Sequence, residues 1–346
     1  MTRRLDDEQP GWGNGGRPRG RWAPTPSGLL HVGSGRTALL TWLSIRQAGG
    51  TLVWRLEDLD PPRTVPGTAE AAMEDLAWLG LDWDEGPDLG GAVGPYRQSE
   101  RSEIYQRALR RLATGGRLFP CRRSRKELKG LATAPHGAAY GGEGSPAYPV
   151  AWRPGDLVDG WFAAFEGPVP KGGAEASLRF RVDPGRVELD DLVQGRWGHD
   201  VEQTIGDFVL RRRDGLFAYQ LAVVVDDLEM AIDEVVRGVD LLDSTPRQLQ
   251  LIDALGGRPP VYAHVPLILD AAGEKLSKRH GALTLRHLRE IGIAPESLVG
   301  YLAWSAGLLD APRPVTPGEL VAGFAWDRLR RDDWLLPEDL GAELRG

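Results

Sequence analysis

Apolar and polar positions in the first part of the chain alternate between the spacing of strands and the spacing of helices. A segment punctuated by Pro and Gly, residues 24–34, runs into apolar residues at positions 38, 39, 42 and 43, which predicts a strand, a tight turn and the start of a helix. The next run, 51–58, predicts a strand that ends at Asp58, because Pro61 and Pro62 force an extended turn. This alternation predicts an α/β fold with a doubly wound parallel sheet, which binds ligands at the carboxyl ends of its strands.

Caps and apolar spacing predict further helices. Thr68 is placed to cap a helix that Gly80 closes, and Ser99 or Ser102 can open another. A later helix is expected in the segment 243–255, which begins with Asp, Ser and Pro.

Residues 121–176 interrupt this rhythm. The Ala-, Gly- and Pro-rich stretch 130–155 has no clear period and predicts a loop-rich insertion. The pattern resumes with apolar runs at 177–182, 207–212 and 221–227, which predict strands.

Composition narrows the class of protein. With 346 residues, 41% of them hydrophobic, the chain can bury a large core. It contains no run of about 18 apolar residues, and its Gly-, Arg- and Pro-rich beginning lacks the apolar core of a signal peptide. The one cysteine, Cys121, excludes an intramolecular disulfide and fits a reducing compartment. We therefore expect a soluble cytoplasmic protein whose first 20 residues form a disordered tail.

The charge of the chain gives no overall basic character. The formal net charge is −7, so any contact with nucleic acid must come from local patches. Positive charge gathers in three runs, at residues 122–126, 211–213 and 328–331. Taken singly, each run is more typical of a solvated helix face or strand end.

Two short motifs indicate the chemistry. Residues 24–34, PTPSGLLHVGS, combine small residues with a helix start, so that backbone N–H groups and the helix dipole favour a phosphate group. Residues 275–282, KLSKRHGA, place Lys275 and Lys278 on a Gly-flanked loop that can cover a triphosphate. Together the motifs suggest adenylate chemistry, in which the α-phosphorus of a nucleotide is attacked.

These motifs resemble the HIGH and KMSKS signatures of class I aminoacyl-tRNA synthetases. With RWAPTPSGLLHVGS, LVWRLEDLDPPR, LFAYQLAVVVDD and VVRGVDLLDSTPRQ in the same order, residues 20–290 look like the catalytic body of glutamyl-tRNA synthetases. The chain resembles more closely a family of short paralogues, the glutamyl-Q tRNA(Asp) synthetases, through its phrase RRRDGLFAYQLAVVVDD and its end soon after KLSKR. That family attaches glutamate to the queuosine base of tRNA(Asp).

The resemblance implies a pocket for L-glutamate. A specific pocket needs cations for two carboxylates and an acidic partner for the ammonium group. The resemblance assigns two arginines to the carboxylates and Glu57 to the ammonium, and which arginine takes the side-chain carboxylate stays open, with Arg21 our choice. The implied glutamate contacts are Arg21, Ala23 through its backbone, Thr25, Glu57, Tyr219 and Arg237.

The resemblance also implies an ATP site, with Mg²⁺ entering as part of the substrate. The implied ATP contacts are His31, Gly33, Ser34, Lys275 and Lys278. Among them His31, Lys275 and Lys278 are the expected catalytic residues, because they can stabilise charge on the transferring phosphorus. Asp226 and Asp227 are not expected to act as an acid/base or metal pair, since adjacent residues on a strand point to opposite faces.

The chain departs from its relatives at two places. Many relatives hold zinc in the insertion with a Cys-x-Cys, a Tyr and a further Cys. Here Cys121 and Tyr148 remain, while Arg123 and Trp152 occupy the other two positions, so we expect no structural zinc. Asp233, four residues before the Arg237 clamp, would repel a carboxylate ligand if it faced the pocket.

Five segments follow from the pattern and the resemblance. They are the tail (1–20), the first half of a Rossmann-like catalytic domain (21–120), the loop-rich insertion (121–176), the second half of that domain (177–270), and the KLSKR loop with a small C-terminal helical subdomain (271–346). No anticodon-binding domain is expected.

The expected partners are L-glutamate, ATP and the anticodon stem-loop of tRNA(Asp). The protein is expected to be a monomer that does not associate with a membrane. Two alternatives stay open. One is a truncated glutamyl-tRNA synthetase that charges the 3′ end of a tRNA, and the other is a non-catalytic paralogue that binds nucleotide or RNA.

Overall fold

The computed structural model describes residues 17–124, 126–128, 140–141, 145–167, 169–170, 172–276 and 283–345. Its centre is a parallel sheet of four strands, β11 (Val261–Val265), β10 (Glu234–Gly238), β1 (Arg19–Trp22) and β2 (Thr51–Trp54), in that order. The strand order reverses at β1, which has β2 on one side and β10 on the other. The predicted doubly wound parallel sheet is confirmed, and the reversal creates the crevice in which such sheets bind ligands.

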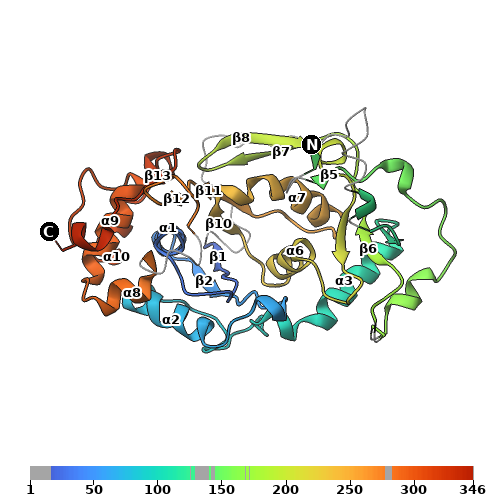
Figure 1. Cartoon of the computed structure of the whole chain (residues 1–346), viewed down its shortest axis with the longest axis horizontal. Coiled ribbons are helices and arrows are strands. Elements are labelled where there is room, and N and C mark those ends of the chain that lie inside the picture. Colours follow the sequence, from blue (N-terminus) through green and yellow to red (C-terminus); the bar gives the residue numbers. More distant parts are fainter. Residues whose placement is uncertain are drawn as a thin grey trace.

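Helices cover both faces of this sheet. The crossover from β1 to β2 is α1 (Val32–Gln47), which lies on one side of the sheet in Figure 1, while α6 (Tyr219–Glu229) and α7 (Thr245–Ala254) lie on the other. Leu52, Trp54 and Val236 point to the α1 side and join its apolar cluster. Val53 and Val235, their neighbours along the strands, point to the opposite side and join a second cluster. The sheet is therefore buried on both faces, as parallel sheets require.

The predicted helices on either side of residue 90 are present as α2 (Thr68–Trp78) and α3 (Ser102–Thr114), and the helix predicted at 243–255 is α7. The predicted cap of α2 is wrong by one residue. Gly67, with φ of 80°, precedes the helix and Thr68 is its first residue. The Thr68 hydroxyl instead lies 2.9 Å from the backbone oxygen of Pro26 and 2.7 Å from that of Val65, which ties α2 to the turn before α1.

The strands predicted at 177–182 and 207–212 are present, but they do not join the parallel sheet. They form an antiparallel sheet with a strand from the start of the insertion, and the members are β3 (Leu118–Cys121), β6 (Ser177–Phe180) and β9 (Phe208–Arg211). In the sequence, a hairpin of β7 (Arg186–Asp191) and β8 (Gly195–Asp200) separates β6 from β9. This hairpin reaches the central sheet, since the backbone N–H of Leu192 donates to the backbone oxygen of Tyr262 on β11.

The strand predicted at 221–227 is wrong, because this run belongs to helix α6. A short continuous apolar run is compatible with a buried strand and with a buried helix, so periodicity alone could not separate the two. Residues 221–227 are all buried, which explains why the sequence shows no polar face there.

A small helical region follows residue 283 and packs against α1 (Figure 1). It contains α8 (Leu285–Glu290), α9 (Pro295–Ala306), α10 (Pro317–Val321) and α11 (Leu340–Glu343), beside the short parallel pair β12 (Ile268–Leu269) and β13 (Trp334–Leu335). This is the small helical appendage that the fold class predicted.

The remaining elements are short. The insertion holds the antiparallel pair β4 (Tyr140–Gly141) and β5 (Ser145–Pro146), and α5 (Val201–Thr204) follows β8. The first strand begins at Arg19, inside the tail that we expected to extend to residue 20, while residues 1–16 of that tail lie outside the described residues. Along the described chain, no helix combines the length and the apolarity needed to cross a membrane.

Candidate active site

A cavity of about 470 Å³ opens at the carboxyl ends of β1 and β10, at the point where the strand order reverses. It gathers side chains from segments far apart in the sequence. Among the residues predicted for the glutamate and ATP sites, those that line it are Arg21, Ala23, Thr25, His31, Gly33, Ser34, Glu57, Tyr219, Arg237 and Lys275. The remaining one, Lys278, lies outside the described residues. The roles of these residues stay predictions, but one cavity holds all those that can be placed.

The N-terminal turn of α1 forms the part of the cavity expected to hold phosphate. His31 is the N-cap, and its Nδ1 accepts a hydrogen bond from the backbone N–H of Ser34 at 3.2 Å. Because Nδ1 is an acceptor there, the proton of a neutral His31 resides on Nε2, which lies 3.4 Å from the Ser34 hydroxyl. A histidine that caps the helix in this way presents a donor beside the positive end of the helix dipole.

Gly33 keeps this turn narrow. A Cβ atom at position 33 would lie 3.0 Å from Nδ1 of His31, tighter than most van der Waals contacts. A larger side chain would therefore push against the capping imidazole. The backbone can then approach a ligand closely only if this position stays glycine.

Lys275 is paired with a carboxylate at the edge of the cavity. Its Nζ donates to Asp240, which also lines the cavity. The backbone at Lys275 is held by an antiparallel β-bridge to Leu269, the last residue of β12. The lysine therefore stands beside the helix α1 turn with its charge partly compensated.

Arg21 enters the cavity from the end of β1. Its side chain is 5% exposed, and Nη1 donates to the backbone oxygen of Val236 at 3.2 Å. Its Nε lies 3.6 Å from the Asp227 carboxylate and has no hydrogen-bond partner among the described residues. A buried guanidinium with unused donors is suited to bind a carboxylate from a ligand.

A second buried arginine, Arg55, organises the acidic side of the cavity. It is fully buried and donates to Asp227 at 2.6 Å and to Glu57 at 3.2 Å. Burial raises the pKa of Glu57, although the positive charges of Arg55 and Arg21 favour its ionised form. Glu57 is thus positioned to accept hydrogen bonds from an ammonium group at the cavity wall.

Asp226 and Asp227 lie on helix α6 rather than on a strand, so the geometric reason given for excluding them as a catalytic pair was wrong. Both carboxylates lie near Arg55, with Asp226 3.8 Å from its Nε, but their hydrogen bonds go to different partners. Asp227 holds Arg55, whereas Asp226 accepts hydrogen bonds from Arg101 at 2.6 Å and from Tyr105 at 2.9 Å. These contacts occupy both carboxylates with structural partners, which fits the anchoring roles predicted for them.

Arg237 comes from β10 and is 5% exposed. Its Nε donates to Nε2 of His264 at 2.9 Å, and its Nη2 donates to the hydroxyl of Thr245 at 2.7 Å. Its Nη1 is buried and has no hydrogen-bond partner in the described part of the chain. The protein therefore engages Nε and Nη2 of the guanidinium, while Nη1 has no partner among the described residues.

A larger groove of about 1240 Å³ adjoins this cavity, because Thr25, Glu57, Arg63 and Tyr219 line both. Two of the three basic runs meet in the groove through Arg123, Arg212 and Arg213. Three further arginines line it: Arg63, Arg179 and Arg247. Arg211 differs from its neighbours, since it is buried and donates to the backbone oxygen of Phe165 at 2.5 Å. The groove is thus large and lined by several arginines, next to the smaller cavity.

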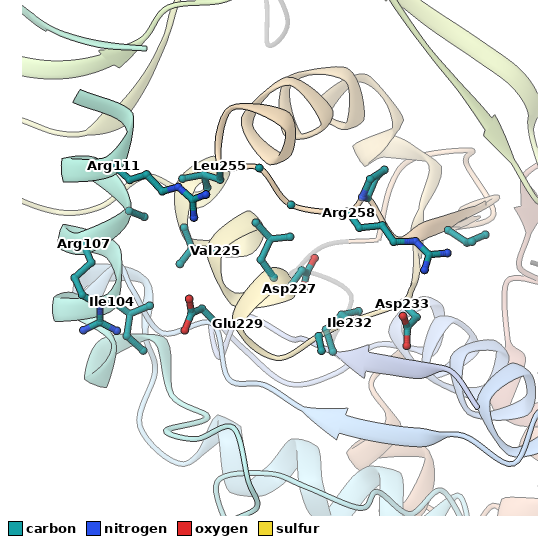
Figure 2. Close-up of a pocket in the computed structure, with 17 residues that line it drawn as sticks. Ile104, Arg107, Arg111, Val225, Asp227, Glu229, Ile232, Asp233, Leu255 and Arg258 are labelled. Carbon is teal, nitrogen blue, oxygen red and sulfur yellow. The ribbon is translucent and has the colours of Figure 1, made fainter. Parts of the chain in front are cut away.

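A separate cavity of about 620 Å³ lies between α3, α6 and the loop after α7, and Figure 2 shows its lining residues. Asp233 lines this cavity and accepts a hydrogen bond from the backbone N–H of Arg19 at 3.0 Å. It does not line the cavity that contains Arg237. The repulsion considered for Asp233 therefore has no structural basis.

The insertion brings together the four positions at which relatives hold zinc, but with other chemistry. Sγ of Cys121 lies 3.4 Å from the Tyr148 hydroxyl, which donates to the backbone oxygen of Trp152 at 3.2 Å. The Arg123 guanidinium lies over the Trp152 ring, 4.9 Å from its centroid. Within the described ranges, no group of three or more His, Cys, Asp or Glu side chains is placed to hold a metal. Cation–π and hydrogen-bond contacts occupy the space instead, so these residues do not fit a zinc ion.

Sequence reasoning missed the residues that hold the predicted ones in place. Arg55, Thr245, His264 and Asp191 are buried polar groups that contact the clamp residues or their partners. The one available signal was a charged or polar residue inside an apolar run, as at Arg55 in TLVWRLED and His264 in VYAHV. A polar residue inside an apolar run predicts that its side chain is buried, but it does not indicate which residue it contacts.

Comparisons with known proteins show the family of the chain. Residues 18–307 match the family described as tRNA synthetases class I (E and Q), catalytic domain. The chain is 48% identical to a glutamyl-Q tRNA(Asp) synthetase of Symbiobacterium thermophilum, over 94% of this chain and 98% of that protein. It is 47% identical to a protein of the same name from Nitratidesulfovibrio vulgaris, over 93% and 96%. Its structure is similar to that of a glutamate tRNA ligase from Elizabethkingia meningosepticum in complex with its amino acid, with a TM-score of 0.78, 28% identity, and 95% and 68% of the two chains covered.

Proposed function

The chain belongs to the class I tRNA synthetases of the glutamate and glutamine group, and from this premise we propose that it activates glutamate with ATP and transfers it to the queuosine base in the anticodon loop of tRNA(Asp). The observation that carries the proposal is the gathering of Arg21, Arg237 and Glu57 with the α1 turn in one cavity. Two cations and one carboxylate complement the two carboxylates and one ammonium of glutamate. The names of relatives that match over almost their whole length favour queuosine as the acceptor.

Activation takes place between the clamp and the α1 turn. An α-carboxylate oxygen of glutamate attacks the α-phosphorus of ATP, the bond to the β-phosphate oxygen breaks, and pyrophosphate leaves. The His31 Nε2–H and the N-terminal turn of α1 stabilise negative charge on the phosphate oxygens, together with Lys275 and Lys278. Mg²⁺ enters with ATP as part of the substrate and adds positive charge at the phosphates. No covalent enzyme intermediate is needed, because the substrate carboxylate is the nucleophile.

Transfer uses the larger groove. We place the anticodon stem-loop there, with the modified base reaching through the shared wall formed by Thr25, Glu57, Arg63 and Tyr219. A hydroxyl of queuosine attacks the carbonyl carbon of glutamyl-adenylate, AMP leaves, and the hydroxyl proton is lost to the departing phosphate or to solvent. We further propose that the protein acts in the cytoplasm, as a monomer, on tRNA(Asp) alone.

The decisive experiment follows radiolabelled glutamate onto tRNA. The purified protein should transfer glutamate to tRNA(Asp) that contains queuosine, and should leave tRNA(Glu) and queuosine-free tRNA(Asp) unlabelled. Nuclease mapping should place the label on the anticodon nucleotide. Label on the 3′-terminal adenosine would instead establish a truncated glutamyl-tRNA synthetase, and an absence of glutamate-dependent ATP–pyrophosphate exchange would favour a non-catalytic nucleotide- or RNA-binding protein.

A further inference from the structure

We propose that Asp191 and His264 are positioning residues that fix the orientation of Arg237 for carboxylate recognition. The inference deepens the proposed function and rests on Arg237 being a glutamate contact. Asp191, His264 and Arg237 form a buried chain of hydrogen bonds that ends at the cavity wall. Neither Asp191 nor His264 lines the cavity, so any effect on the substrate must pass through Arg237.

The contact between His264 and Arg237 follows from the register of the central sheet. β10 and β11 are parallel neighbours, and Arg237 is the register partner of His264. Residues opposite each other on neighbouring strands point to the same face, so the two side chains meet. Nε of Arg237 lies 2.9 Å from Nε2 of His264, and His264 is fully buried.

Asp191, at the end of β7, selects the tautomer of His264. Its carboxylate accepts hydrogen bonds from three backbone N–H groups, those of Val193 at 3.0 Å, Gln194 at 2.9 Å and His264 at 3.1 Å. Since it is surrounded by donors, Asp191 can only be the acceptor toward Nδ1 of His264, which lies 2.6 Å away. The proton therefore resides on Nδ1, and the lone pair of Nε2 faces Arg237. This is the same logic by which a buried carboxylate orients histidine in other enzymes.

The chain of bonds leaves one edge of the Arg237 guanidinium for the substrate. His264 engages Nε and Thr245 engages Nη2, so that rotation of the guanidinium would break both hydrogen bonds. The Tyr262 ring supports the group from one side, with its centroid 5.2 Å from the guanidinium carbon, and is itself stacked on the His264 ring at 5.8 Å. Nη1 remains without a protein partner in the described structure. A donor held in place before the ligand arrives does not lose side-chain entropy on binding.

The ionisation states agree with this geometry. Burial lowers the pKa of His264, and the adjacent positive charge of Arg237 lowers it further against the opposing effect of Asp191. Burial alone would raise the pKa of Asp191, but its hydrogen bonds with His264 and with backbone N–H groups hold it below its usual range. A neutral imidazole between a carboxylate and a guanidinium is the state that the hydrogen bonds require.

The test uses Asp191→Asn, with Asp190→Asn as its matched control. Asp190 is exposed and is the next residue along the same strand. In Asp191→Asn, the NH₂ group of the new amide must face either the backbone N–H groups or Nδ1 of His264. In the first orientation, donor meets donor at the backbone. In the second, Nδ1 must accept, so the imidazole proton moves to Nε2 and meets the Nε–H of Arg237. We expect the KM for glutamate in ATP–pyrophosphate exchange to rise about ten- to hundredfold, the range for loss of one hydrogen bond at a charged group, while the KM for ATP changes far less.

A second pair of variants covers the case in which Asp191→Asn fails to fold. His264→Phe keeps a ring against Tyr262 but removes both nitrogens, and should raise the KM for glutamate in the same way. His264→Gln restores an acceptor toward Arg237 and should recover part of the loss. An equal rise in both KM values, or no difference between the Phe and Gln variants, would overturn the positioning role.

The tautomer can be measured without any substrate. Nitrogen-15 NMR of histidine-labelled protein, with His264→Gln to assign the signal, should show a proton on Nδ1 and a bare Nε2. A proton on Nε2 in the unaltered protein would overturn the proposal whatever the enzyme does. If the tautomer is as expected but the unaltered protein shows no glutamate-dependent exchange, the proposed function fails and the hydrogen-bond chain stands as a finding about the fold.

Discussion

Glu234, the first residue of β10, carries a buried carboxyl group that meets Ser44 of α1. It is 1% exposed, and its Oε1 has no hydrogen-bond partner among the described residues. Burial raises its pKa to about 7, and a hydrogen bond with Ser44 offsets only part of that effect. Because the pKa is higher in the folded chain than in the unfolded one, ionisation destabilises the fold: the penalty is absent in acid and complete above about pH 7.

Glu234→Gln should therefore gain stability relative to the unaltered protein as the pH rises. Between about pH 4.5 and pH 8, the free energy of unfolding of the variant should rise relative to that of the unaltered protein by up to about 3 kcal/mol. This is the free energy that corresponds to the change in the pKa of Glu234 on folding. Chemical denaturation at several pH values measures it. Glu229→Gln, at an exposed position on α6, is the control, and a difference between Glu234→Gln and the unaltered protein that does not vary with pH would contradict the prediction.

Lys278 is the residue for which we expect the largest effect on activation. Exchange of pyrophosphate into ATP should need glutamate but no tRNA, and Lys278→Ala should slow it by about a hundredfold or more, because a preorganised donor to the transferring phosphoryl group is lost. Lys126→Ala, at an exposed lysine of the insertion, should leave the rate unchanged. A fully active Lys278→Ala protein, or exchange that appears only with tRNA, would refute this assignment.

The residues that line the cavity could be predicted as a group from the sequence, because they lie in motifs with a fixed order. Arg21 and His31 are examples, and the structure brings them into one cavity. Their supporting residues could not be predicted, since Asp191 reaches His264 from a hairpin 73 residues away. Nothing local in the sequence indicates which strand a buried carboxylate will meet.

At the scale of elements, the insertion has packing contacts at the positions where the resemblance implies zinc ligands. The stacking of Arg123 on Trp152 and the contact of Cys121 with Tyr148 replace ligands by packing. We expect less than one zinc per chain by elemental analysis and an unchanged melting temperature in chelator. The double variant Arg123→Cys, Trp152→Cys supplies the two missing thiolates at positions that already converge, and should acquire zinc. Stoichiometric zinc in the unaltered protein, or a melting temperature that falls in chelator, would contradict the prediction.

Element types were predictable where a cap or a turn accompanied the apolar pattern. α7 followed from its Ser and Pro start, and β2 from the prolines after it. α6 did not, because it is buried over residues 221–227 and shows neither a polar stripe nor a side-chain cap. β6 pairs antiparallel with β9 on one side and with β3, from before the insertion, on the other, and the sequence of no one of these strands alone could indicate its partners.

At the scale of the whole molecule, a chain with a net charge of −7 must bind RNA through a local patch. The arginines at 123, 212 and 213 line the groove beside the active-site cavity, whereas the run 328–331 lines neither the groove nor that cavity. Arg213→Ala should weaken binding of tRNA(Asp) and reduce the slope of log affinity against log salt by about one. Arg331→Ala, which removes an exposed arginine from the other run, should change neither quantity. Equal effects of the two variants in filter binding across a salt series would argue against the groove as the RNA site.

The charges around Arg55 have a consequence for how this protein can change over evolutionary time. Arg55 pairs with Glu57, Asp227 and Asp226, and Asp226 also pairs with Arg101, so that helix α6, the segment after β2 and the residue before α3 share one set of buried charges. Removal of a single member leaves an uncompensated buried charge, which typically costs about 3–5 kcal/mol, a large part of the stability of an ordinary domain. A single substitution in this set would therefore cost the fold much of its stability, whichever amino acid the cavity binds. The set can be inherited whole or replaced by coordinated substitutions, and the acidic wall of the pocket should therefore be the slowest part of the site to diverge.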